Sequence, residues 1–121
     1  MKNKSTMTVQ DLTEKLGLVT YSGKVGVSRK VTGGYASDLL SDVMGHAREG
    51  QIWVTLQTHK NVMAIASLKD LAAVILVKDN KPDEDTLAQS NYEEIPILGT
   101  SKETFEISGE LYRLLKENEI I

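Results

Sequence analysis

Polar side chains gather in short segments that follow apolar runs of the sequence. The segments span residues 57–61, 78–81 and 99–102. Their hydroxyls, amides and lysine ammonium groups are typical ligands of an anion or a nucleotide, above all where a helix begins with free backbone N–H groups. The candidate ligand-binding residues are Gln57, Thr58, His59, Lys60, Asn61, Asp79, Asn80, Gly99, Thr100 and Ser101. The alternative is that these residues only cap helices and form turns.

The sequence gives little support for a catalytic site or a metal site. His46 and His59 are the only histidines, and without cysteine the chain has no zinc-ligand spacing. Asp38, Asp42 and Asp79 could act as acids or bases, but no nucleophile is patterned with them. We therefore expect no catalytic residues, no metal site and no cofactor, and we interpret the protein as a non-enzyme.

Two glycine motifs have plainer interpretations. Residues 45–50 carry the glycine spacing of a P-loop, but Gln51 and Ile52 stand where lysine and serine or threonine are required. Residues 23–26 match the short backbone-clamping loop of KH domains, yet strand-like residues flank them. The first motif is typical of a turn between helix and strand, and the second of a hairpin turn.

The candidate residues need elements that bring them together. Apolar runs at residues 52–56, 72–77 and 95–98 predict strands, and helix-patterned segments follow each run. Strands linked through helices pair in parallel, with right-handed crossovers. Because the carboxyl ends of parallel strands meet at one edge of a sheet, we expect the three polar segments to converge there.

Helix starts are predicted from capping residues. Thr8 precedes a helical pattern that ends at Gly17. The other predicted starts are Ser37 or Asp38, Asn61, the acidic run after Pro82, and a capping box of Thr100 with Glu103. The residues expected to face inward include Leu39, Leu40, Val43, Met44, Val62, Ile65, Ala66, Leu68, Leu87, Ala88, Tyr92, Phe105, Leu111, Leu114 and Leu115. Gly109 interrupts the last helix, which indicates a kink or a close helix contact.

The N-terminal part adds two further strands. Residues 18–21 have strand composition, and Val25, Val27 and Val31 are spaced like a weaker strand that ends at residues 33–34. The expected fold is a three-layer α/β/α sandwich with a mostly parallel or mixed central sheet. We expect a disordered tail at residues 1–7 and a single domain at residues 8–121.

Composition restricts the class of partner. The 121 residues carry a net charge of −3 and are 40% apolar, typical of a globular domain. The longest apolar stretch, residues 71–77, is far shorter than a membrane span, and the acidic balance disfavours nucleic acid. With no cysteine and no signal-peptide pattern, we expect a cytoplasmic protein that binds neither membrane nor nucleic acid.

Longer strings in their order and spacing resemble a known family. They are residues 31–44, 52–57, 64–66, 73–76 and 95–100, with Pro82 and residues 105–106. Together they resemble stand-alone members of the DRTGG domain family, which are relatives of the N-terminal domain of HPr kinase. Where many members place Gly-Asp-Arg after the central strand, this chain has Thr58, His59 and Lys60, and residues 78–80 replace a later Gly-Gly.

The resemblance implies a function as well as a fold. It implies a three-layer α/β domain, a homodimer, and a sensing or scaffolding role beside an unidentified partner enzyme or regulator, without phosphotransfer. We interpret the chain as a non-catalytic regulatory module that self-associates and binds a small nucleotide or phosphorylated metabolite at the strand ends. The alternative is a protein-interaction subunit with no small ligand, which binds through an apolar surface around Tyr35.

Overall fold

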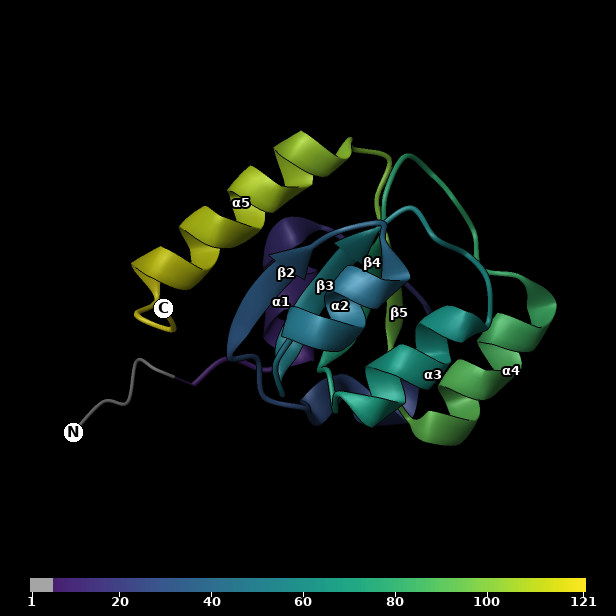
Figure 1. Ribbon diagram of the computed structural model, residues 1–121. Coiled ribbons are helices and arrows are strands. Elements are labelled where there is room, and N and C mark those ends of the chain that lie inside the picture. The colour runs from purple at the N-terminus through teal and green to yellow at the C-terminus, as the bar shows by residue number, and fades with distance from the viewer. Residues whose placement is uncertain (1–5) are drawn as a thin grey trace.

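Alternating short strands and helices make up residues 6–121, which the computed structural model describes (Figure 1). The strands are β1 Val19–Ser22, β2 Gly33–Ala36, β3 Gln51–Thr55, β4 Ala73–Leu76 and β5 Ile97–Gly99. The helices are α1 Val9–Leu16, the 3-10 helix η1 Lys24–Ser28, α2 Leu40–His46, α3 Asn61–Leu68, α4 Glu84–Glu93 and α5 Thr104–Glu117. Of the expected tail at 1–7, residues 1–5 lie outside the described part, whereas Met7 is buried and its carbonyl accepts from the Val31 N–H.

The strands form one five-stranded sheet in the order β1-β5-β4-β3-β2. The pairs β2–β3, β3–β4 and β4–β5 are parallel, and β1 pairs antiparallel with β5. The predicted mostly parallel or mixed central sheet is confirmed. None of the helices in residues 6–121 has both the length and the apolar character needed to cross a bilayer.

Helices cover both faces of the sheet, which confirms the three-layer sandwich (Figure 1). Side chains alternate along the strands, so Ile52 and Val54 contact one core and Trp53 the other. Helices α1 and α5 pack on the Ile52 face, while α2 and α3 pack on the Trp53 face and α4 lies beside α3. Strands apolar on both faces require this double cover.

Both ends of α1 are capped as predicted. The Thr8 hydroxyl accepts from the Asp11 N–H at 3.1 Å, and the Asp11 carboxylate accepts from the Thr8 N–H at 3.0 Å. Gly17 ends the helix with φ 64°, a conformation that glycine adopts without steric cost.

The expected strand through Val25 and Val27 is wrong. This segment forms η1, and Val25 is 74% exposed. Gly26 lies so close to the Glu94 carbonyl that any Cβ would collide with it. The N-terminal strand that pairs with β3 is β2, which begins at Gly33. Gly34 passes beneath Leu111 of α5, where an added Cβ would lie 2.9 Å from a methyl group.

Three predicted helix caps also differ. α3 begins at Asn61 itself, after Lys60, and its first turn is closed by His59 Nδ1, which accepts from the Asn61 N–H. α5 begins after Glu103, so the capping box with Thr100 does not form. α2 begins after Leu39, and the Ser37 hydroxyl accepts from the Leu39 N–H in a turn that precedes the helix.

Several helix residues that were predicted to face inward are exposed instead. Leu39, Leu68, Tyr92 and Phe105 are exposed, and Phe105 reaches 91%. Met44 and Ala88 are exposed as well, and Leu87 is half-buried. α4 instead turns Thr86 and Ser90 inward, where their hydroxyls donate to the backbone carbonyls of Thr58 and Ile95. A hydroxyl that bonds a buried carbonyl can therefore replace an apolar residue in this layer.

Two glycine substitutions test the packing of η1. Gly26→Ala should destabilise the fold by about 1–3 kcal/mol, because its methyl group meets the backbone carbonyl of Glu94. Gly45→Ala is the matched control: an added Cβ has nothing within 4 Å, and alanine favours the helix by up to about 1 kcal/mol. Urea unfolding measures both, and equal stability of the two variants would contradict the tight approach at Gly26.

Candidate functional site

The polar segments follow β3, β4 and β5, and these parallel strands end at the same rim of the sheet. From this rim the chain leaves β4 toward α4 and leaves β5 toward α5, which cover opposite faces (Figure 1). A crevice forms where neighbouring connections diverge in this way, and ligands of open α/β sheets bind in such crevices. The structure therefore makes the ends of β4 and β5 the candidate site.

A depression of about 420 Å³ lies at this place. Its lining consists of Leu16, Gly17, Val19, Tyr21, Asp79, Gly99, Thr100, Ser101 and Lys102. Four of the predicted site residues, Asp79, Gly99, Thr100 and Ser101, are thus brought together. The volume is in the range of small-ligand sites.

Beside the depression, two backbone hydrogen bonds join the loop after β4 to the loop after β5. The Lys78 N–H donates to the Lys102 carbonyl and the Asp79 N–H to the Thr100 carbonyl, each at 2.9 Å. Lys78 and Asp79 both have φ 58°, a left-handed conformation that is uncommon outside glycine. The backbone N–H groups of these two residues are used within the protein, so neither is available to a ligand.

The polar side chains that line the depression differ in exposure and in the hydrogen bonds that they already make. Ser101 and Asp79 are exposed, whereas the Thr100 hydroxyl accepts from the Lys102 N–H. Lys102 Nζ donates to both carboxylate oxygens of Glu110 at 2.7 and 2.8 Å, and this bond raises the pKa of Lys102. The site offers hydroxyls and a carboxylate directly, and an ammonium group that already has an anionic partner.

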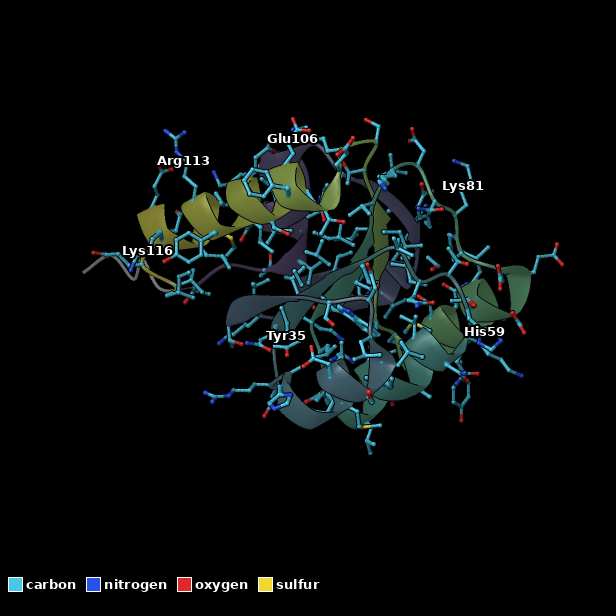
Figure 2. All side chains as sticks on the ribbon, turned by 45° about the horizontal axis from the view of Figure 1, so that its top comes forward. Tyr35, His59, Lys81, Glu106, Arg113 and Lys116 are labelled. Atoms are coloured by element: carbon cyan, nitrogen blue, oxygen red, sulfur yellow. The ribbon has the colours of Figure 1, made fainter. Side chains whose placement is uncertain are left out.

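An aromatic ring adjoins the depression. Tyr21 lies across Gly99, where an added Cβ would collide with the ring. The Lys81 ammonium group lies over this ring, 5.6 Å from its centroid. Figure 2 labels Lys81 beside the loop that precedes α4. Sequence reasoning missed Tyr21 and Gly17, because no pattern after residue 50 reveals that β1 folds back beside β5.

The remaining predicted site residues lie outside this depression. Gln57 donates through Nε2 to the Asp38 carbonyl at 3.0 Å, and the Thr58 carbonyl accepts from the Asp83 N–H and the Thr86 hydroxyl. His59, Lys60 and Asn61 form the turn into α3. Asn80 donates to the Val77 carbonyl at 2.8 Å.

Asp38 has a role that the sequence did not reveal. Its Oδ1 accepts from the Thr55 hydroxyl at 2.8 Å and from the Leu56 N–H at 2.9 Å. The carboxylate thus joins the connection after β2 to the end of β3 and is not a helix cap. Its partners are 17 and 18 residues away in the chain, so local spacing gives no signal.

A second polar cluster lies beside α2. The Tyr35 hydroxyl donates to Asp42 Oδ2 at 2.8 Å, and His46 Nδ1 lies 3.3 Å from Asp42 Oδ1. The hydrogen bond from Tyr35 holds the pKa of Asp42 below its ordinary value of 3.8, and the same bond raises the pKa of Tyr35 above 10.0. A tyrosine held neutral is a hydrogen-bond donor and not a base.

The starts of α4 and α5 do not favour anions. α4 begins with Glu84 and Asp85, and α5 carries Glu106 in its first turn. These carboxylates already offset the positive ends of the helix dipoles. Within residues 6–121 no group of three or more His, Asp or Glu side chains is placed to hold a metal ion.

Comparison with solved structures gives an informative similarity. No family model matches the sequence, and no curated protein is similar to it. The fold is similar to the crystal structure of the CBS and DRTGG domains of the regulatory region of Clostridium perfringens pyrophosphatase, complexed with its activator diadenosine tetraphosphate. The TM-score is 0.66 at 11% identity, over 91% of this chain and 46% of that one.

This similarity defines the class of fold. The chain spans about half the length of that regulatory region and has a DRTGG-like α/β fold. The matched structure is a regulatory region and not a catalytic domain. The expected resemblance is therefore confirmed for the fold.

The Tyr35–Asp42 pair predicts a defined pH dependence. Asp42 has its lowered pKa only in the folded state, so its stabilising effect is present above pH 3.8 and is lost as pH falls through the lowered value. Tyr35→Phe should remove the largest contribution to this effect, whereas the smaller contributions of Ser37 and His46 remain. The stability advantage of the natural protein over the variant should be full near neutral pH, shrink below about pH 5, and vanish in acid.

Thermal unfolding across this pH range measures the advantage. Tyr92→Phe is the control, because it removes a hydroxyl from a side chain that is 81% exposed. An advantage of natural Tyr35 that persists unchanged in strong acid would show that Asp42 is not its source.

Proposed function

We propose that this chain is a non-catalytic regulatory module, a stand-alone relative of DRTGG domains, that binds a small nucleotide or phosphorylated metabolite at the ends of β4 and β5. The observation that supports the proposal most is the position of the 420 Å³ depression, which lies where the connections to α4 and α5 diverge. Its lining comes from segments at both ends of the chain.

The chemistry of the lining suits the parts of a nucleotide. The Asp79 carboxylate is an acceptor for ribose hydroxyls, in the way that acidic residues serve in dinucleotide-binding folds. The Tyr21 ring offers a surface for a base, and Lys102 can exchange Glu110 for a phosphate. Thr100 and Ser101 add hydroxyls that bind either phosphate or sugar.

The structural neighbour supports a regulatory role. That protein is the regulatory region of a pyrophosphatase, and its crystal contains an activating dinucleotide. We carry over to this chain only the class of role, a domain that binds a nucleotide and acts on a partner. The partner enzyme or regulator is unidentified, and we propose that the module acts as a homodimer.

A second candidate function is a protein-interaction subunit without a small ligand. One observation favours it: Phe105 and Tyr112 on α5 are 91% and 60% exposed. Large exposed aromatic side chains on one helix are typical of association surfaces. The two functions differ in which edge of the sheet they use, so they can be separated by mutation.

Isothermal titration tests ligand binding directly. The natural protein, titrated with ATP, ADP, AMP and a sugar phosphate at millimolar concentration, should bind one of the nucleotides, and Thr100→Ala with Ser101→Ala should weaken binding by about tenfold. Asn61→Ala is the control, because Asn61 is exposed at the same rim but does not line the depression. If none of these ligands gives a heat of binding or a change in melting temperature, ligand binding is refuted and the protein-interaction subunit remains as the function.

A further inference from the structure

Helix α5 has a second face that no other part of residues 6–121 covers. Phe105, Gly109, Tyr112 and Lys116 recur at intervals of four, three and four residues, the spacing of a helix-pairing seam, and we call them the outer stripe. All four are exposed. The buried stripe of Ile107, Leu111 and Leu115 is separate and faces the sheet.

Gly109 makes no close contact within residues 6–121. A Cβ added there would meet nothing within 4 Å, and α5 runs without interruption from Thr104 to Glu117. A glycine inside a helix costs about 0.5–1 kcal/mol relative to alanine. Gly109 shares this open space with Gly45 of α2, but only Gly109 stands between two exposed aromatic residues, where a close approach from outside would give it a use.

The outer stripe continues into an apolar groove. This groove has a volume of about 330 Å³ and lies between α5 and the glycine-rich strand β2. Tyr112 belongs to both the stripe and the groove. The groove therefore extends the surface of the outer stripe toward β2.

The adjoining edge of the sheet has little protection against association. β2 ends the sheet on this side, and it contains neither a charged residue nor proline nor a bulge. The opposite edge, β1, has an irregular register between Thr20 and Ser22. Of the devices that natural edge strands carry against association, β2 has only its short length of four residues.

We infer that the outer stripe, the groove and the β2 edge bind a second copy of this chain, with the two α5 helices antiparallel about a two-fold axis. Placing the axis halfway between Gly109 and Glu110 sets Tyr112 of one copy between Phe105 and Gly109 of the other. The same axis sets Glu106 opposite Arg113. One placement thus satisfies both the shape of the stripe and the charges beside it.

The charges along α5 favour this antiparallel arrangement. Figure 2 shows Glu106 toward the N-terminal half of the helix and Arg113 and Lys116 toward its C-terminal half. Parallel helices would place each charge beside its own kind, whereas antiparallel helices pair opposite charges on both sides of the axis. A heterologous partner would have no reason to match this internal order, so a second copy fits best.

This inference deepens the self-association in the proposed function and does not require that a ligand binds. The depression lies at the β1–β5 side of the sheet and the proposed interface at the β2 edge, which is the other end of the strand order. A result on one surface therefore does not decide the other.

Sedimentation equilibrium of the full chain over a dilution series tests the interface. The natural protein should be a dimer, twice 13.3 kDa. Gly109→Gln should raise the dissociation constant at least about tenfold by filling the hole for Tyr112, while its melting temperature at monomeric dilution stays equal or rises, because glutamine favours a helix. Tyr112→Ser should also weaken the dimer, and the control Tyr92→Ser on α4 should not.

A charge exchange tests the antiparallel arrangement. Glu106→Arg alone and Arg113→Glu alone should each weaken the dimer about tenfold, because each places like charges together twice. Mixing the two variants should restore a heterodimer, in which both contacts pair opposite charges. A dimer that Gly109→Gln and the charge variants leave intact would overturn this interface alone, and a monomer at millimolar concentration would overturn self-association as well. Failure of the mixture to pair would overturn the antiparallel arrangement.

Discussion

The side chains of residues 71–77 are almost completely excluded from water, and the need to cover both faces of such strands decides where each helix lies. β2, β3, β4 and β5 follow one another in space in the order of the chain, so the right-handed crossovers α2, α3 and α4 all fall on one face. The other face can be covered only by the elements before and after this series. Those elements are α1 and α5.

Because of this arrangement, there is a single place where the connections that follow two neighbouring strands lead to opposite faces of the sheet. Every connection up to α4 returns on the same face, and only the chain leaving β5 crosses to the other face. The depression lined by Asp79 and Thr100 lies at that divergence. Its remaining wall comes from α1 and β1, because α1 must share the second face with α5. The candidate site is thus a consequence of how the sheet is covered.

The parts of the fold that could be predicted are those fixed by strong local patterns. Apolar runs fixed β3, β4 and β5, and Thr8 with Gly17 fixed α1, because burial and capping act over a few residues. Parallel pairing then placed the polar segments at one rim, including Asp79 and Thr100. These inferences required only periodicity and the rules of strand connection.

The missed features depend on contacts between distant residues. Val25 and Val27 have strand spacing, but the close approach of Gly26 to Glu94 holds their segment in a 3-10 helix. Ser90 belongs to the inner face of α4 because its hydroxyl meets the Ile95 carbonyl and the Ser22 hydroxyl. Tyr21 adjoins the candidate site only through its place across Gly99. No local pattern encodes such pairs.

The proposed site and the proposed interface are connected through one helix. The segment from Thr100 to Lys102 lines the depression and leads directly into α5, and Lys102 is bonded to Glu110, the neighbour of Gly109. A ligand phosphate that took Lys102 from Glu110 would leave the Glu110 carboxylate without its cation, on the helix that carries the outer stripe. Because binding free energies are reciprocal, a ligand that changed the stability of the dimer through this contact would bind with different affinities to the dimer and to the monomer.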